Sequence, residues 1–227
     1  MLDAFLELVL PARCGGCDAL GELFCVRCRA ATRKLEEPLC PRCGAELESA
    51  RRRDCGCRAR LRHLARIRSY GVYDGPLERA LHRFKYRGRR SLAQPLALLL
   101  AERLAVDGLA GEAISWVPLG ARRRRQRGYN QAELIARALA GLTSLPLLER
   151  GLKRLRETPT QVGLDRPRRL INVADAFGYQ GRPIGGRSIL LLDDVATTGA
   201  TLDACAAALK AAGSGPVFGF TVARATL

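Results

Sequence analysis

The chain has 227 residues, of which 48% are hydrophobic, and it carries a formal net charge of +16. This length suits one good-sized domain or a small domain beside a medium one, and the apolar fraction excludes a chain that is disordered throughout. Arginine accounts for 34 of the 38 basic residues, and its planar fork suits phosphate oxygens, so the composition favours a polyanionic partner. A simple arginine-rich composition bias explains the surplus equally well.

The first residues do not resemble a secretion signal, because they include Asp3 and Glu7 and lack a basic start. No later segment is long and apolar enough to span a bilayer. We therefore expect a cytoplasmic protein without membrane insertion. Nine cysteines in a reducing compartment indicate metal binding before disulfides.

Eight of the nine cysteines lie between Cys14 and Cys57, which marks a small N-terminal module over residues 1–62. Three C-x-x-C pairs and one C-x-C pair each let two thiolates reach one tetrahedral ion, so eight thiolates fit two structural Zn²⁺ ions. We favour sequential pairing, although interleaved pairing fits the same spacing. The expected ligands are Cys14, Cys17, Cys25 and Cys28 for one ion, and Cys40, Cys43, Cys55 and Cys57 for the other. The arrangement resembles a double zinc ribbon.

Residues 63–227 alternate between strand-like and helix-like segments. In chain order we expect a strand over 67–73, a helix from Leu77 that ends before Gly88, a helix over 92–106, a strand over 113–117, a helix over 130–140, a strand over 189–192, a helix over 201–212 and a strand over 217–222. Asn130 is the expected N-cap of its helix, with Glu133 in the capping-box position and Gly141 past the end. This alternation predicts an α/β fold with a mainly parallel sheet flanked by helices. Cys205 lies on the apolar face of its helix and is expected to fill core volume.

The segment from Ser188 to Thr201 reads SILLLDDVATTGAT and joins a buried strand to two acids and a small-residue loop. Ligands of parallel sheets bind beyond the carboxyl ends of the strands, where Asp193 and Asp194 are expected. Successive side chains diverge, so the two carboxylates suit neighbouring hydroxyls or a metal bound through water. The following loop offers backbone N–H groups and a helix N-terminus to a phosphate. A ribose 5-phosphate carries both the neighbouring hydroxyls and the phosphate that such a site would bind.

An ordinary polar turn is the alternative interpretation of this segment. A P-loop nucleotide site is excluded because no glycine–lysine phosphate motif is present.

The string ILLLDDVATTGAT is similar to the phosphoribosyl pyrophosphate (PRPP) motif of type I phosphoribosyltransferases. This resemblance implies that Asp193 and Asp194 are the catalytic acids, which hold the ribose hydroxyls. It assigns the 5-phosphate to the loop of Val195, Ala196, Thr197, Thr198, Gly199, Ala200 and Thr201.

Further segments resemble the ComF family of bacterial competence proteins: WVPLG at 116–120, GYNQAE at 128–133, FKYRG at 84–88, and residues between Arg156 and Phe177. Together with the cysteine-rich start, they imply a type I phosphoribosyltransferase fold over 63–227 behind the double zinc ribbon. The same resemblance adds Leu119, Gly120, Arg122, Arg156 and Lys85 to the PRPP-binding residues. It also implies a mobile loop over 150–169 that closes over PRPP.

The run from Arg122 to Arg127 contains five arginines, too concentrated for one helix face. Some suit pyrophosphate, while Arg123, Arg124, Arg125 and Arg127 suit a nucleic-acid backbone. A solvated charge run is the alternative.

The ComF resemblance implies a protein that binds PRPP with Mg²⁺ and acts in DNA uptake, contacting single-stranded DNA (ssDNA) through its basic surface. Its expected partners include a DNA-uptake helicase or another competence protein. An active phosphoribosyltransferase with an unidentified acceptor is the alternative, and a zinc-ribbon adaptor is a third. Few residues follow the last expected strand, where several relatives of the fold recognise the acceptor base, which favours the binding function.

Overall fold

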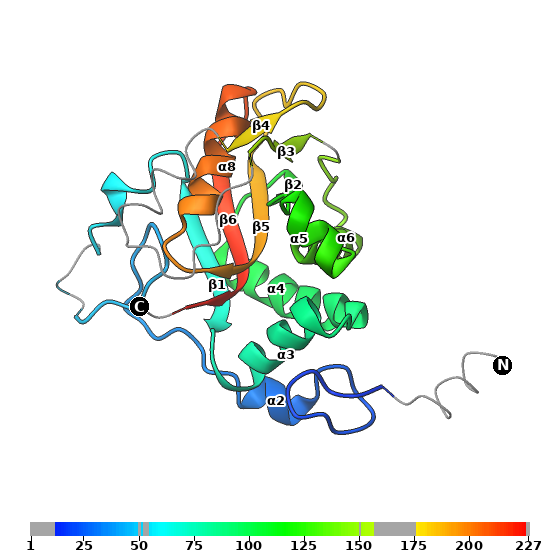
Figure 1. Cartoon of the computed structure of the whole chain (residues 1–227). Coiled ribbons are helices and arrows are strands. Elements are labelled where there is room, and N and C mark those ends of the chain that lie inside the picture. Colours follow the sequence, from blue (N-terminus) through cyan, green and yellow to red (C-terminus); the bar gives the residue numbers. More distant parts are fainter. Residues whose placement is uncertain (1–11, 50, 52–54, 150, 157–175, 226–227) are drawn as a thin grey trace.

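A four-stranded parallel sheet forms the centre of the computed structural model, which describes residues 12–49, 51, 55–149, 151–156 and 176–225 (Figure 1). The strand order is β1 (Arg66–Val72), β6 (Val217–Arg224), β5 (Ile189–Ala196) and β2 (Ala113–Trp116), with every neighbouring pair parallel. Leu147 extends the β2 edge by a single parallel bridge to Ile114. The predicted parallel α/β architecture is therefore confirmed.

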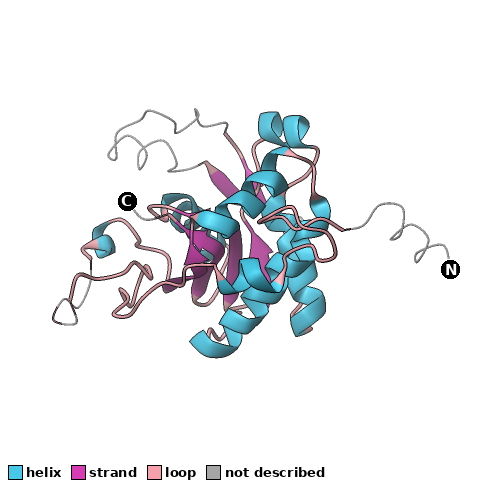
Figure 2. Ribbon diagram, turned by 90° about the horizontal axis from the view of Figure 1, so that it is seen from below, coloured by secondary structure: helices cyan, strands magenta, loops and turns pink. Residues whose placement is uncertain are grey.

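Helices lie on both faces of this sheet (Figure 2). The side chains of β5 alternate between the two faces, as the period of a strand requires. Leu190 and Leu192 join an apolar cluster with α4 (Ala93–Asp107) and α6 (Gln131–Thr143), whereas Ile189 and Leu191 join a second cluster with α8 (Ala200–Ala211). Cys205 is fully buried in this second cluster, so its expected place in the core is confirmed.

The remaining elements surround the carboxyl edge of the sheet and the N-terminal module. They are α2 (Val26–Ala30), η1 (Cys57–Ala59), α3 (Gly75–Tyr86), η2 (Arg90–Leu92), α5 (Ala121–Arg127), and the antiparallel pair β3 (Leu152–Arg154) and β4 (Phe177–Tyr179). None of the helices within the described ranges combines the length and the apolar character needed to cross a membrane.

Several elements differ from the sequence-based expectation. The arginine run forms the short helix α5, and neither strand of the β3–β4 pair was expected. Strand β5 continues through both aspartates to Ala196, because its ladder with β6 persists as far as the pair of Ala196 and Arg224. Of the loop expected over 150–169, only residues 151–156 lie among the described residues.

Of the capping residues predicted for helix α6, the one at the start is confirmed and the one at the end is not. Asn130 caps the helix as expected, accepting a hydrogen bond from the Ala132 N–H at 3.1 Å. The helix nevertheless passes Gly141 and ends at Thr143, where Ser144 adopts the left-handed conformation with φ of 57°. Glu133 forms an ion pair with Arg137 at 3.2 Å.

The N-terminal module divides into two ribbons whose buried cysteines join the apolar clusters on opposite sides of the sheet. Cys14 and Cys28 belong to the apolar cluster on the α4 side, and Cys40 and Cys57 belong to the cluster on the α8 side. In Figure 1 the first ribbon lies below α3 and the second beside β1. The chain from the end of the first ribbon into the start of the second runs along the outer edge of β1: the Val72 N–H donates to the Arg33 carbonyl (2.9 Å) and the Ile67 N–H to the Arg42 carbonyl (2.6 Å). This segment covers an edge strand that would otherwise be open to pairing.

Candidate functional site

A cavity of about 180 Å³ lies at the carboxyl end of the sheet, where parallel sheets bind their ligands. Strand β5 contributes the two aspartates, the turn after β2 forms one wall, and α3, α5, α6, β3 and the start of α8 supply the rest. Its lining residues are Lys85, Val117, Pro118, Leu119, Arg123, Arg127, Asn130, Gln131, Ala132, Arg154, Asp193, Asp194 and Thr201.

The two aspartates have different partners, as the alternation of a strand predicts. The Asp194 carboxylate forms an ion pair with the Lys85 ammonium at 2.9 Å, and both side chains are largely buried. The Asp193 carboxylate accepts the backbone N–H of Asp194 at 2.8 Å. The pKa of Asp193 is raised to about 7, mainly because burial removes the carboxylate from water and secondly because of the negative charge of Asp194. Asp193 is therefore partly protonated near neutral pH.

Four cations face these two acids across the cavity: Lys85, Arg123, Arg127 and Arg154. Burial alone would lower the pKa of Lys85, but the carboxylate of Asp194 raises it above its ordinary value, so the ammonium stays charged. A surplus of positive charge in a partly enclosed space attracts an anion, because the walls screen the charges poorly. The cavity thus combines acceptors for hydroxyl groups with a strongly cationic wall.

Gln131 supplies a further sign that the cavity takes a polar ligand. Its side chain is almost fully buried in the lining, and its Oε1 accepts a hydrogen bond from Arg127 at 3.0 Å. Its Nε2 is buried without a hydrogen-bond partner among the described residues. A buried amide donor without a partner costs about 1–3 kcal/mol, and a bound acceptor oxygen would remove that cost.

The loop after β5 has the form of a phosphate cradle. Gly199 has a φ of +81° and precedes the first turn of α8, and the Ala200 N–H donates to Thr198 Oγ1 at 3.3 Å. A Cβ on Gly199 would also lie 2.7 Å from Ile67 Cδ1, so both the backbone and the packing require glycine here. The helix N-terminus adds a partial positive charge beside Thr201.

The expected PRPP-binding residues divide between the cavity lining and its surroundings. Lys85, Leu119 and Thr201 line the cavity together with both aspartates. Several expected residues lie outside the lining. They are Val195 and Ala196 at the end of β5, Thr197, Thr198 and Gly199 in the following loop, Ala200 at the start of α8, Gly120 before α5, and the exposed Arg122 and Arg156. Asn130, Gln131 and Arg154 were missed as site residues, because only the fold brings them to the aspartates.

Helix α5 separates the arginines that were grouped as nucleic-acid contacts. Arg123 and Arg127, four residues apart, face the cavity. Arg124 lies 3.7 Å from Glu133, and Arg125 is exposed. The run therefore does not form one surface: one side of α5 turns toward the aspartates and the other toward solvent.

The two cysteine clusters form separate four-sulfur sites, and their ligands follow the sequential pairing. Cys14, Cys17, Cys25 and Cys28 form one cluster and Cys40, Cys43, Cys55 and Cys57 the other, with all four sulfurs of each within 4.8 Å of one another. Four convergent thiols suit a tetrahedral zinc ion and leave no open position for a substrate. The C-x-C pair, Cys55 and Cys57, belongs to the second cluster. His63 is not a member, because its Nδ1 lies 3.0 Å from Asp203 Oδ2.

Backbone N–H groups already favour thiolate at one cysteine in each cluster. In the first, the Gly16 and Cys25 N–H groups donate to Cys14 Sγ at 3.4 and 3.3 Å. Burial would raise the pKa of Cys14, but these donors outweigh it and lower the pKa to about 6. The pKa of Cys40 is lowered to about 6 in the same way. Thiolate is the form that binds zinc, so Cys14 and Cys40 are suited to the ion, whereas burial raises the pKa of Cys28 and Cys57.

Comparison with known proteins adds independent information. A family model described as a double zinc ribbon domain matches residues 5–60. The DNA utilization protein YhgH of Escherichia coli is 33% identical over 205 residues, which cover 86% of this chain and 89% of the relative. Competence protein F of Haemophilus influenzae is 32% identical over 195 residues (83% and 85%), and competence protein ComFC of Bacillus subtilis is 30% identical over 210 residues (89% and 85%).

Proposed function

The chain belongs to the ComF family, and from this premise we propose that it binds PRPP with Mg²⁺ in the aspartate cavity and acts on single-stranded DNA during DNA uptake. The observation that carries the proposal is the cavity itself. It holds two carboxylates, four cations and a buried amide nitrogen without a partner among the described residues, all at the carboxyl edge of a parallel sheet.

The parts of PRPP match the parts of this site one by one. Asp193 and Asp194 accept hydrogen bonds from the two ribose hydroxyls. The N–H groups between Thr197 and Thr201, with the start of α8, hold the 5-phosphate. Leu119 and Gly120 present their backbone to the pyrophosphate, and the cations of the cavity neutralise it. Mg²⁺ bound to the pyrophosphate would be held beside the carboxylates and would offset phosphate charge.

The remaining basic surface serves the second part of the proposal. Arg125 is exposed and lies outside the lining of the aspartate cavity, and the names of the relatives refer to DNA utilization and competence. Contacts from arginine to phosphate are independent of base sequence and weaken steeply with salt. We place this activity in the cytoplasm, where an uptake helicase or another competence protein would hand over the strand.

A calorimetric titration of PRPP and Mg²⁺ tests the cavity. We expect binding to the wild-type protein and the loss of most of the heat in an Asp193→Asn/Asp194→Asn double variant. Glu102→Gln is the matched control, because it makes the same chemical change on α4, where Glu102 pairs with Arg29. Equal heats for the double variant and the control would remove the proposal.

A second candidate function is transfer of the ribose 5-phosphate to an acceptor, and one observation favours it. A second cavity of about 590 Å³ adjoins the first and shares Pro118, Leu119, Asn130 and Arg154 with it, while Trp116 adds an aromatic wall. In this reaction the acceptor displaces pyrophosphate from the sugar, and the two aspartates stabilise the oxocarbenium-like transition state.

Pyrophosphate release from PRPP separates the two functions. Transfer predicts that a free nucleobase or another acceptor accelerates the release, and that the double aspartate variant abolishes the acceleration. A rate that no tested acceptor changes, together with intact PRPP binding, supports a protein that binds PRPP without turnover.

A further inference from the structure

One aromatic ring stands out on the basic surface beside the cavity. Tyr86 is the last residue of α3 and is 57% exposed, and within the described parts of the chain no other tyrosine, phenylalanine or tryptophan is similarly exposed. The ring centroid of His82 lies 4.8 Å from that of Tyr86. The Arg127 guanidinium lies 4.9 Å from the centre of the ring and donates to the Tyr86 hydroxyl at 3.2 Å. The ring is therefore held in place while much of it stays open to solvent.

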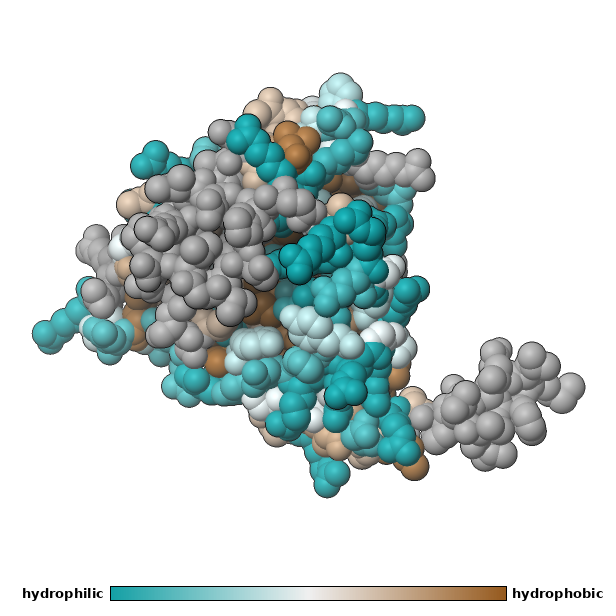
Figure 3. Space-filling model, in the orientation of Figure 1, coloured by the Kyte–Doolittle hydropathy of each residue, from teal (hydrophilic) through white to brown (hydrophobic). Residues whose placement is uncertain are grey.

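Further exposed arginines lie next to Tyr86 in the chain and on the neighbouring helix α5. Arg87 follows Tyr86 directly, and Arg90 lies over the Tyr129 ring at 4.8 Å and against the backbone of Gly128. Arg125 lies on the neighbouring helix α5. No carboxylate of the described residues forms an ion pair with Arg87, Arg90 or Arg125. Figure 3 shows hydrophilic side chains gathered over α5 on this face of the molecule.

We infer that Tyr86 and His82, with Arg87, Arg90, Arg125 and Arg127, form a binding surface for single-stranded DNA in which a base stacks on Tyr86 and the arginines hold the neighbouring phosphates. We call this set the Tyr86 surface. The inference rests on the proposed DNA function and gives it a location and a contact mode that arginines alone would not provide.

The chemistry of the surface selects this partner. A cluster of arginines without carboxylate partners repels itself until a polyanion is present. A fixed, exposed aromatic ring offers a stacking face to an unpaired base, whereas the bases of a duplex already stack on one another. Because the tyrosine ring is already oriented, stacking on it costs little further side-chain entropy.

The position of the Tyr86 surface links it to the cavity. Arg127 contacts Tyr86 and also lines the cavity that contains Asp193 and Asp194. Lys85, the residue before Tyr86, forms the ion pair with Asp194 from the same helix end. A strand that stacks on Tyr86 would therefore pass the mouth of the proposed PRPP site.

Fluorescence anisotropy with a labelled oligothymidine strand tests the inference over a series of salt concentrations. Tyr86→Ala should weaken binding by about tenfold, which matches the loss of one stacked base, and should leave the salt slope unchanged. Tyr86→Phe keeps the ring and should bind nearly as the wild type does. Arg125→Gln should instead lower the salt slope by about 0.7, the value for one phosphate contact on a single strand. Val106→Ala, at another exposed position, is the control for a surface change.

An abasic strand of the same length separates stacking from charge. Tyr86→Ala should bind this strand as the wild type does, since no base is present to stack. Equal loss on both strands, or no loss on either, would overturn the Tyr86 surface while the wild-type protein still binds DNA. Failure of the wild type to bind any single strand would overturn the DNA part of the proposed function as well, and the PRPP titration would still report separately on the cavity.

Discussion

The two four-cysteine sites share a motif, but they differ in burial and in the part of the fold that each ribbon packs against. In the first site Cys17 is exposed and Cys25 is half-buried, and the ribbon docks on α3. In the second site Cys40, Cys43 and Cys57 are all buried, and the ribbon docks on the sheet itself. Arg224, the last residue of β6, donates to the Cys43 carbonyl at 2.6 Å.

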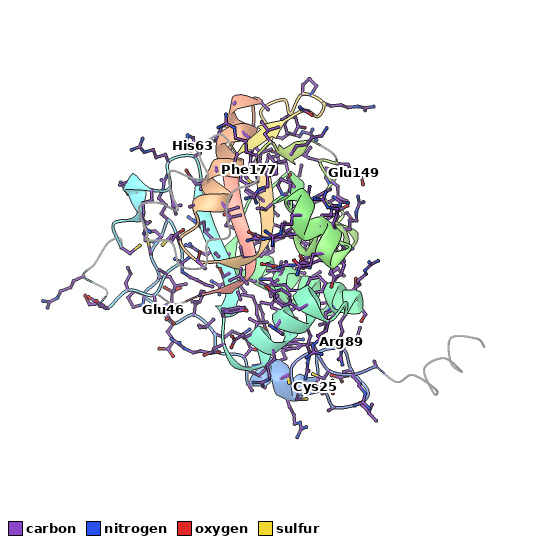
Figure 4. All side chains as sticks on the ribbon, in the orientation of Figure 1. Cys25, Glu46, His63, Arg89, Glu149 and Phe177 are labelled. Atoms are coloured by element: carbon purple, nitrogen blue, oxygen red, sulfur yellow. The ribbon has the colours of Figure 1, made fainter. Side chains whose placement is uncertain are left out.

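The surroundings of the second site lead directly to the candidate cavity. Leu61 packs against Gly199 in the loop that we assign to the phosphate. In the first turn of α8, Asp203 accepts hydrogen bonds from the backbone N–H groups of His63 and Leu64 at 2.9 and 3.1 Å, and Figure 4 shows His63 beside this helix. The two zinc motifs are therefore similar in sequence but differ in structural role: the first ribbon covers helix α3, while the second supports the loop after β5 that we assign to the phosphate.

Removing one ligand from each site is expected to give the largest difference. Cys43→Ser and Cys17→Ser should each lower the zinc content from two ions to one by native mass spectrometry. Cys43→Ser should cost several kcal/mol of folding stability, because binding at a structural zinc site contributes directly to folding, and it should also abolish PRPP binding. Cys17→Ser should cost less and should leave PRPP binding in place. Equal losses of stability and of PRPP affinity in the two variants would contradict the division of roles.

Each ribbon is also anchored by an arginine that donates to a cysteine carbonyl, which provides a milder matched pair. Arg224 is 8% exposed, whereas the Arg83 side chain is 26% exposed and donates to the Cys14 carbonyl at 2.9 Å. Arg224→Gln should lower the free energy of unfolding by about 2–3 kcal/mol, and Arg83→Gln by about 1 kcal/mol, because water replaces the partly exposed Arg83 more easily than the buried Arg224.

Urea unfolding followed by circular dichroism measures both changes. Only Arg224→Gln should also weaken PRPP binding, since β6 ends beside the phosphate loop: the Ala225 N–H donates to the Ala196 carbonyl at 2.9 Å. A larger loss in Arg83→Gln would reverse the assigned roles.

The sequence was informative about local features and less so about the cavity. Cysteine spacing predicted both metal sites because the ligands of each lie within 18 residues of chain, and the βαβ pattern predicted the sheet. The ion pair of Lys85 and Asp194 and the position of Arg154 join distant segments, so no spacing rule reveals them. The extension of β5 past its aspartates depends on pairing with β6. The unpartnered amide of Gln131 follows from packing, and the sequence gives no signal for it.

The smallest effect concerns protons, and it follows from the pKa of about 7 at Asp193. In the free protein at pH 6 most Asp193 side chains carry a proton, which Mg²⁺ and PRPP should displace. The affinity for PRPP should therefore rise with pH up to about 7 and then level off.

Folding stability should change with pH in the opposite direction. Between the ordinary pKa of 3.8 and about 7 the folded chain keeps a proton that the unfolded chain releases, so this group's contribution to stability falls as the pH rises.

Calorimetry at pH 6 in two buffers of different ionisation enthalpy counts the released protons, and repetition at pH 8 should find nearly none. This release also sharpens the comparison of the two ribbons, because it reports on the cavity alone. It should persist in Cys17→Ser, whose zinc site lies on the α3 side, and vanish with PRPP binding in Cys43→Ser. Identical heats in both buffers at pH 6 would show that Asp193 is already ionised. Proton release in Cys43→Ser would show that the cavity forms without the second ribbon.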